Sequence, residues 1–313
     1  GKGLGNKFLD DARQADVLIH VIDASASTDN NGRPVRAGTG DPTFDIRFVE
    51  EEFDLWIESI IGRDWSKTAR EAESQGQKLE QLLAKRLSGL AISEQVITTA
   101  IQTSGLSLKK PVTWNHDDVL LFCKVLRTKA KPFVIAANKA DLPSAEDNIK
   151  KIKDGGLELI PCASEAEALL RKASKKGILH YLPGDASFDV KPEVTLNAQQ
   201  QKALDIVKGF MQKYGSTGIQ EVINIACFKF LRMVEVYPVE DEFKLTDKKG
   251  NVLPDVWLLP EGSTAKDLAG AIHADLAKGF LYAIDVRTKQ RISASYQLKS
   301  GDVIKIASAT SRG

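Results

Sequence analysis

The chain has 313 residues, a length that predicts about two domains. Its hydrophobic content of 42% and charged content of 27% are those of an ordinary globular protein that can bury a core. The formal net charge of +1 gives no overall preference for nucleic acid or membrane. The three cysteines lie far apart in the sequence, which excludes a disulfide framework and a C-x-x-C site and favours a reducing compartment.

The N-terminal part predicts a strand followed by a long helical segment. A short helix is expected at about residues 6–15, and the apolar run at 17–23 is typical of a buried parallel strand. Residues 24–43 are rich in Ser, Thr, Asn, Gly and Pro and predict a long exposed loop. The helical pattern that follows is too long for one crossover between strands. It therefore predicts an inserted helical subdomain at about 44–127, in which Asn115 can cap a helix.

The middle of the chain alternates between strands and helices. Apolar runs predict strands at 132–137 and 157–162, and a helix is expected at about 165–176. Two more helices are expected within 196–231, separated by the Gly-Ser-Thr-Gly at 215–218. This order predicts a parallel α/β layer covered by helices. No apolar run approaches the ~20 residues of a membrane span, and the first residues do not resemble a secretory signal. We therefore expect a cytoplasmic protein.

The C-terminal part predicts short strands around one helix. Ser263 or Thr264 can cap a helix that runs to about Lys278, and residues 248–251 read as a turn. A hairpin, one helix and further strands in so short a segment predict a β-grasp (ubiquitin-like) domain. The expected strands are at 232–238, 243–246, 252–259, 280–286 and 303–307.

The most informative motif is Asn138-Lys139-x-Asp141, which directly follows the apolar run at 133–137. A carboxylate at Asp141 can accept hydrogen bonds from guanine N1–H and from the 2-amino group. Adenine has neither donor on that edge, so a wrong base leaves polar groups unpaired. Asn138 can hold the loop, and the Lys139 stem can lie on the plane of the base. The competing interpretation is a polar turn that caps a strand.

Several segments together resemble the YchF-like branch of the Obg-related GTPases. They are Gly-Leu-Gly-Asn-Lys-Phe-Leu at 3–9, the helical insertion, and Tyr-Gly-Ser-Thr-Gly-Ile-Gln-Glu-Val-Ile-Asn at 214–224. Leu-Thr-Asp at 245–247 and Leu-Tyr-Ala at 281–283 resemble a TGS domain. The resemblance covers essentially the whole chain. N-K-x-D resembles the archaeal-type, guanine-preferring members, whereas better known members replace the Asp and prefer ATP.

The resemblance implies a partial P-loop GTPase domain at 1–230, with a parallel sheet and a helical insertion, and a TGS β-grasp domain at 231–313. It also implies a second base loop after the next strand, where Ala163 and Ser164 stand in place of the usual Ser and Ala. A backbone N–H there would contact the guanine oxygen, which any residue except Pro can supply. Asp23 ends the first strand and either contributes to this site or caps its own loop.

The phosphate-binding pattern G-x-x-x-x-G-K-[ST] occurs nowhere in the 313 residues. In the family, the phosphate loop, a switch threonine and an Asp-x-x-Gly motif would precede Gly1. We therefore expect either an upstream extension or a lineage that has lost phosphate binding. GTP or GDP is the expected ligand. Mg²⁺ is expected for the intact protein, with its ligands outside this chain, and no catalytic or metal-binding residue is assigned.

The resemblance implies a GTP-binding, ribosome-associated protein that hydrolyses GTP when intact, while this chain alone would be inactive. The alternative is a non-catalytic ribosome- or RNA-binding module with a vestigial nucleotide site. Arg287, Lys289 and Arg291 alternate, so on a strand they would share one face and could contact RNA. A solvated hairpin face is the competing interpretation. No membrane partner and no DNA specificity are expected.

Overall fold

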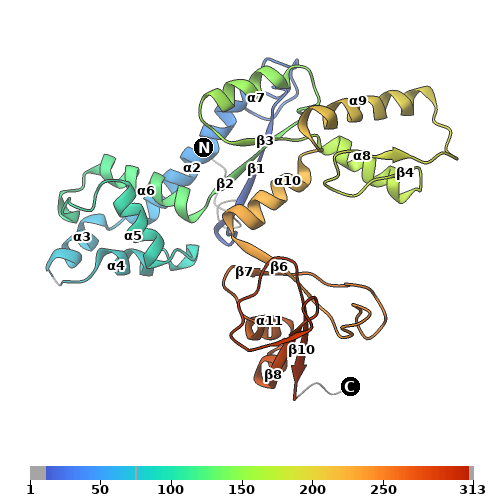
Figure 1. Ribbon diagram of the computed structural model, residues 1–313. Helices are drawn as coiled ribbons and strands as arrows, with labels where there is room; N and C mark the ends of the chain where they lie inside the picture. The colour runs from blue at the N-terminus through green and yellow to red at the C-terminus, as the bar shows by residue number, and fades with distance from the viewer. Residues whose placement is uncertain (1–11, 75, 310–313) are drawn as a thin grey trace. The chain divides into compact units, whose positions relative to one another are not determined.

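The computed structural model describes residues 12–74 and 76–309 (Figure 1). The chain divides between Ala226 and Cys227 into two compact units, each with a hydrophobic core of its own. The helix expected at 6–15 falls mostly outside the described residues. Among those residues, no helix is both long enough and apolar enough to cross a membrane.

The N-terminal unit is built on a three-stranded parallel sheet in the order β1-β2-β3. Asp23 lies opposite Asn138 in the register, and Ala137 lies opposite Pro161. The carboxyl ends of the three strands therefore meet at one edge, which is where open α/β sheets bind ligands. The predicted α/β class is confirmed. The strands are β1 (Leu18–Asp23), β2 (Phe133–Asn138) and β3 (Leu159–Pro161).

Strand β2 is buried on both faces because helices cover both sides of the sheet. Ile135 and Ala137 belong to the core that contains residues of α7, α8 and α9, whereas Val134 and Ala136 pack with residues of α10. A two-stranded hairpin lies beyond α8. These elements are α7 (Ala145–Asp154), α8 (Ser164–Lys175), β4 (Leu179–His180), β5 (Asp189–Val190), α9 (Ala198–Tyr214), α10 (Ile219–Asn224) and a π-helical turn (Ile225–Phe230).

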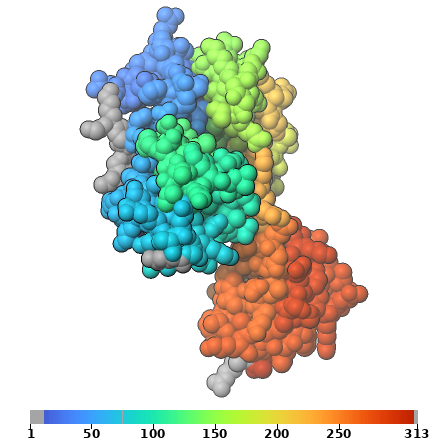
Figure 2. All heavy atoms as spheres, turned by 90° about the vertical axis from the view of Figure 1, so that its left-hand side faces the viewer, coloured from blue at the N-terminus to red at the C-terminus, as the bar shows by residue number. Residues whose placement is uncertain are grey.

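The helical insertion between β1 and β2 has its own core, and in Figure 2 its blue-green and green atoms form one closely packed group. Trp65 and Trp114 stack in this core with ring centroids 5.1 Å apart. Asn115 accepts a hydrogen bond from the Asp118 N–H and caps α6, as its sequence predicts. The helices are α2 (Pro42–Gly62), α3 (Trp65–Ser74), α4 (Leu79–Arg86), α5 (Glu94–Thr103) and α6 (His116–Ala130), with 3₁₀ turns at Ser88–Leu90 and Pro111–Thr113.

The C-terminal unit is a five-stranded mixed sheet in the order β7-β6-β10-β8-β9, packed on helix α11. Strand β10 runs parallel to β6, and the other pairs are antiparallel. Thr264 caps α11 through a capping box. The elements are β6 (Met233–Pro238), β7 (Trp257–Pro260), α11 (Ala265–Ile272), α12 (Ala274–Lys278), β8 (Phe280–Asp285), β9 (Gln290–Ile292) and β10 (Asp302–Ser308).

Several expected elements differ from the structure. The strand expected at 243–246 is absent, because Thr246 makes only isolated bridges to Asp241 and Val252. The helix expected to reach Lys278 is broken at His273, whose backbone is extended. The loop that follows β1 is less exposed than expected, since its first three residues, 24–26, are buried.

Candidate nucleotide-base site

The loops that follow β2 and β3 are joined through their backbones. The Cys162 N–H donates to the Ala137 carbonyl at 2.8 Å, and the Ala140 N–H donates to the Cys162 carbonyl at 3.0 Å. Lys139, between these contacts, has a φ of 59°, in the left-handed region that few side chains adopt. The two loops that the sequence assigned to the base are therefore neighbours.

A side chain strengthens this link. The Asn138 Oδ1 accepts a hydrogen bond from the Ser164 N–H at 3.1 Å. Ser164 is the first residue of α8 and is exposed, whereas Ala163 is buried and its N–H donates to the Thr217 carbonyl at 3.0 Å. The structure thus brings Asn138, Ala163 and Ser164 together. The N–H groups of Ala163 and Ser164 are thus both engaged within the protein, and neither is the free backbone donor that was expected for the guanine oxygen. Ser164 is exposed, and its hydroxyl makes no hydrogen bond with another described residue.

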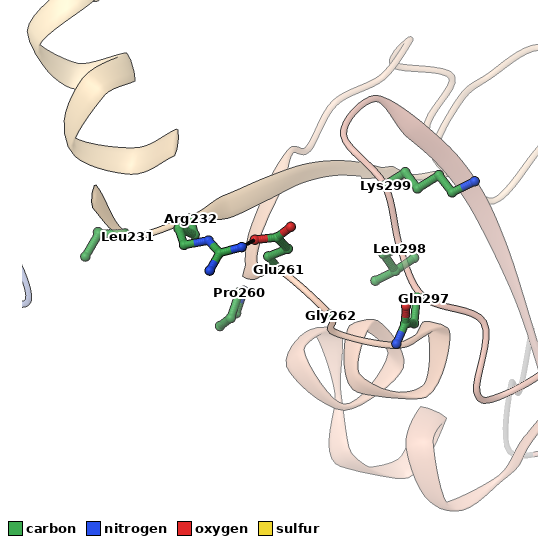
Figure 3. Close-up of a pocket in the computed structure, with 8 residues that line it drawn as sticks. All are labelled: Leu231, Arg232, Pro260, Glu261, Gly262, Gln297, Leu298 and Lys299. Carbon is green, nitrogen blue, oxygen red and sulfur yellow. Dashed lines mark ion pairs between the residues drawn. The ribbon is translucent and has the colours of Figure 1, made fainter. Parts of the chain in front are cut away.

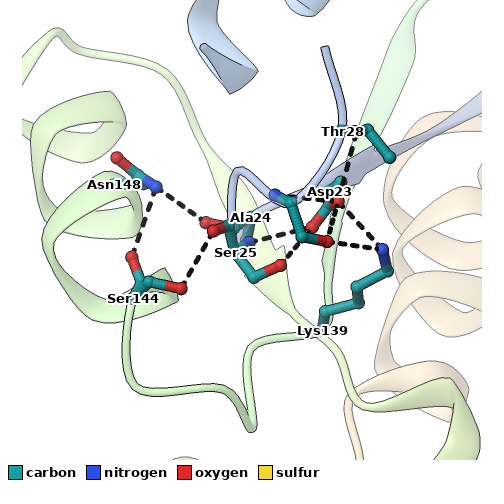
Figure 4. Close-up of polar contacts among 8 residues, drawn as sticks. Asp23, Ala24, Ser25, Thr28, Lys139, Ser144 and Asn148 are labelled. Carbon is teal, nitrogen blue, oxygen red and sulfur yellow. Dashed lines mark hydrogen bonds and ion pairs between the residues drawn. The ribbon is translucent and has the colours of Figure 1, made fainter. Parts of the chain in front are cut away.

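Lys139 is held in place by Asp23, the last residue of β1 (Figure 4). Asp23 lies opposite Asn138 of β2 in the register. The Lys139 Nζ lies 2.9 Å from the Asp23 Oδ2 and 2.9 Å from the Ser27 Oγ. The Lys139 side chain remains 42% exposed, so its stem is accessible to a ligand, while the Asp23 side chain is only 10% exposed. Burial by itself raises the pKa of Asp23, but hydrogen bonds from Ser25, Lys139 and Ser27 lower it to about 2.

The loop after β1 is fastened to the same edge. Both oxygens of Asp23 accept hydrogen bonds from this loop, including one from the Ser25 hydroxyl at 2.6 Å. The Asn148 amide of α7 donates to the Ala24 carbonyl, and the hydroxyl of Ser144, which precedes α7, donates to the Ser25 carbonyl. Both distances are 2.9 Å (Figure 4). Asp23 therefore caps its own loop, as expected, and also contacts Lys139 of the motif. Nothing in the sequence marked Ser144 or Asn148.

The Asp141 carboxylate is half-buried and makes no hydrogen bond or ion pair with another described residue. It borders a small cavity of about 180 Å³ whose other walls include Phe210 and Tyr214 of α9. An ion pair of 2.7 Å between Glu146 and Lys213 lies beside the same cavity. The carboxylate is thus available to accept hydrogen bonds from a ligand.

Other chemistry receives no support from the described residues. Across residues 12–74 and 76–309, no group of three or more His, Cys, Asp or Glu side chains could hold a metal ion. Burial raises the pKa of the Cys162 thiol to about 12, and it also raises the pKa of Cys123. Both thiols are therefore protonated at neutral pH and unsuited to act as nucleophiles.

The basic residues of the C-terminal unit are arranged differently from the expected stripe. Arg287 and Lys289 lie in the turn between β8 and β9, and only Arg291 lies on a strand. The prediction of a basic stripe along one strand is therefore wrong, because the chain reverses direction between these residues. The Arg291 guanidinium lies over the Tyr282 ring at 4.3 Å from its centroid. All three basic residues are exposed, so they form a basic hairpin tip.

The C-terminal unit also has an open groove of about 530 Å³ between three loops (Figure 3). Arg232 and Glu261 form an ion pair there, with side chains that are 73% and 55% exposed. The pair neutralises the arginine that lines the groove and leaves Lys299 as the remaining lining cation. The groove therefore presents little concentrated charge to a ligand.

Comparisons with known protein families match two successive segments of the chain. Residues 136–241 match the family described as Obg-like GTPase YGR210-like, G4 motif-containing domain. Residues 244–308 match the TGS domain. The first match contains both base loops, and the second contains most of the mixed sheet.

Individual proteins match over nearly the whole chain. An uncharacterized GTP-binding protein of Methanocaldococcus jannaschii is 47% identical over 311 residues, which are 99% of this chain and 77% of that protein. The ribosome-binding ATPase YchF of Bacillus subtilis is 23% identical, over 90% of this chain and 66% of that protein. The crystal structure of a GTP binding protein from Pyrococcus horikoshii is similar with a TM-score of 0.70 and 41% identity. The match covers 96% of this chain and 81% of the Pyrococcus chain.

Proposed function

Because the chain belongs to the YchF/Obg-like family of GTP-binding proteins, we propose that it binds a guanine nucleotide through Asn138, Lys139 and Asp141. The main support is that the Asp141 carboxylate has no hydrogen-bond or ion-pair partner among the described residues. In addition, Lys139 of the same motif is held by Asp23. Asp141 accepts from the N1–H and 2-amino group of guanine, and the Lys139 stem covers one face of the base. Ala163 and Ser164 complete the site on the side of the 6-oxygen, where the Ser164 hydroxyl is the donor that the loop leaves for a ligand.

The base contacts explain a preference between nucleotides. Two donors of guanine meet one carboxylate in this arrangement, whereas adenine would leave the Asp141 carboxylate without them. Sites that hydrogen-bond a substrate reject an analogue that lacks the matching groups much more strongly than apolar pockets do. We therefore assign guanine rather than adenine to this chain, in a family whose named members include both GTP-binding proteins and ATPases.

Base contacts position a nucleotide but do not hydrolyse it. Phosphoryl transfer depends on groups that hold the phosphates and Mg²⁺ and that neutralise charge in the transition state. We assign no residue of this chain to those tasks. The proposal for the whole protein is a GTP hydrolase to which this chain contributes recognition of the base.

A titration with a fluorescent GTP analogue in Mg²⁺ buffer tests the proposal on the protein as its gene encodes it. Saturable binding that GTP displaces better than ATP is expected. Asp141→Asn should reduce the preference for GTP over ATP by about tenfold or more, because it removes the charged acceptor. Asp147→Asn, at an exposed carboxylate in the first turn of α7, is the matched control and should leave the preference unchanged. An unaltered preference in Asp141→Asn would refute the base assignment.

A second candidate function is a ribosome- or RNA-binding module in which the nucleotide site is vestigial. The basic hairpin tip of Arg287, Lys289 and Arg291 favours it, since three exposed cations can contact phosphates. One relative is named as a ribosome-binding ATPase. Co-sedimentation with ribosomes in the absence of nucleotide would support this candidate. Saturable binding of GTP would exclude a vestigial site.

A further inference from the structure

Thr217 lies between α9 and α10 and contacts the second base loop in two ways. Its carbonyl accepts the hydrogen bond from the Ala163 N–H at 3.0 Å. Its hydroxyl donates to the Glu167 Oε2 at 2.5 Å. Thr217 is fully buried, so both contacts are shielded from water. A single residue therefore holds the start of α8 at its backbone and at a side chain one turn later.

Glu167 is a fixed point in this arrangement because three side chains donate to its carboxylate. The Tyr181 hydroxyl lies 2.6 Å from Oε2, and the Arg171 Nε lies 2.5 Å from Oε1. The Glu167 N–H also donates to the Ala163 carbonyl at 3.1 Å. Burial by itself raises the pKa of Glu167, but the hydrogen bonds from Thr217, Tyr181 and Arg171 lower it below its usual value. The carboxylate is therefore charged and satisfied at neutral pH.

The chain after Thr217 approaches the same loop very closely. Gly218 has a φ of 81°, and a Cβ there would lie 2.1 Å from the Pro161 carbonyl oxygen. Only glycine permits this approach. The segment that contains Thr217 thus lies in close contact with the end of β3, where the second base loop begins.

We propose that Thr217 and Glu167 are positioning residues that fix the Ala163–Ser164 loop and so set its contact with the 6-oxygen of guanine. The inference rests on the proposed function, because it requires the base to lie between the two loops. Asp141 then accepts hydrogen bonds from the N1–H and the 2-amino group. Thr217 and Glu167, which we call the Thr217–Glu167 clamp, position the loop that contacts the 6-oxygen. The 6-oxygen is thereby contacted by one part of the site, and the N1–H and 2-amino group by another part with its own support.

Three nucleotides separate these contributions. GTP carries the 6-oxygen, the N1–H and the 2-amino group. Inosine triphosphate lacks only the 2-amino group, whereas the triphosphate of 2-aminopurine riboside lacks both the 6-oxygen and the N1–H. Thr217→Val removes the hydroxyl and keeps the side-chain volume. It should weaken GTP and inosine triphosphate about fivefold to tenfold, which is the effect of losing one neutral hydrogen bond to the 6-oxygen, and leave the 2-aminopurine nucleotide nearly unchanged. Thr217→Ser should restore binding.

Two further variants test the same proposal if Thr217→Val folds poorly. Tyr181→Phe removes another donor to Glu167 and should shift the three affinities in the same pattern, by a smaller factor. Thr68→Val, at a buried threonine of the helical insertion whose hydroxyl donates to a backbone carbonyl, is the matched control and should change none of them.

The outcomes distinguish the clamp from the site that it supports. Equal weakening of all three nucleotides, or no weakening, in both Thr217→Val and Tyr181→Phe would overturn the clamp. In that case the base assignment still stands if Asp141→Asn lowers the affinity for GTP toward that for inosine triphosphate. Only the clamp is then overturned. An unchanged ratio of GTP to inosine triphosphate in Asp141→Asn would overturn the base assignment, and the clamp would fall with it.

Discussion

At the scale of single residues, the proposed base site depends on charged side chains whose hydrogen-bond partners lie far away in the sequence. Lys139 adopts a left-handed backbone conformation in which its ammonium reaches Asp23 and Ser27. Such a conformation persists when surrounding contacts determine it. Asp23 supplies those contacts, because its buried carboxylate is charged and joins the Lys139 ammonium to the loop after β1.

Asp23→Asn should destabilise the N-terminal unit in a pH-dependent way. The folded pKa of Asp23, about 2, lies below the ordinary value of 3.8. Its stabilisation is therefore complete above about pH 4 and is lost as the pH falls toward 2. After allowance for solvent screening, we expect a loss of about 1–2 kcal/mol at pH 7. The difference from the natural protein should shrink as the pH falls through this range.

Urea denaturation at pH 7 and near pH 3 measures this difference, with Asp147→Asn as the control. Guanine-nucleotide affinity of Asp23→Asn should also fall, since Lys139 loses its anchor. A stability difference that stays constant between the two pH values would show that Asp23 does not act through its charge.

At the scale of elements, the site is an edge where three strand ends and one helix start meet. Its geometry is set by close backbone approaches more than by long side chains. The closest of these approaches is at Gly218, the N-cap of α10, which lies directly against the end of β3. Any side chain there must push α10 away from the sheet that it covers.

Gly218→Ala should therefore destabilise the N-terminal unit by about 2–4 kcal/mol, because it combines a steric clash with an unfavourable φ. Gly209→Ala is the matched control, since Gly209 lies within α9 and a Cβ there meets nothing within 4 Å. That change should stabilise by up to about 1 kcal/mol. Thermal unfolding of the two variants checks the contrast, and similar melting temperatures would contradict it.

At the scale of the whole molecule, the two units carry the two proposed kinds of contact, one with a nucleotide base and one with RNA. The N-terminal unit holds the base loops, and the C-terminal unit presents the basic hairpin tip of Arg287, Lys289 and Arg291. The overall charge of +1 hides this separation, because opposite charges elsewhere balance the tip. Any electrostatic attraction to RNA is consequently local and depends on salt.

Replacing Arg287, Lys289 and Arg291 by Ala should reduce co-sedimentation with ribosomes. Each lost phosphate contact lowers the salt dependence of log affinity by roughly 0.7–0.9, so three contacts lower it by roughly 2–3. The control replaces Lys244, Lys248 and Lys249, three exposed lysines of the same unit, and thus removes the same charge. Equal losses in the two triple variants would indicate a nonspecific charge effect and would count against the hairpin tip.

The sequence by itself determined the features that depend on short-range patterns. Apolar runs predicted the three parallel strands, Asn115 and Thr264 predicted helix starts, and N-K-x-D marked the edge of the sheet. These succeed because periodicity and capping act over a few residues. The strand expected at 243–246 failed for the same reason, since a short apolar segment does not reveal whether it finds a partner strand.

Only the tertiary structure decided which groups meet. Lys139 and Asp23 are 116 residues apart, and Thr217 and Glu167 are 50 residues apart. No local pattern encodes either pair, because each is created when strands and helices pack. The sequence thus predicts which residues read a guanine base, and the packing of β1, α8 and the segment before α10 decided what holds those residues in place.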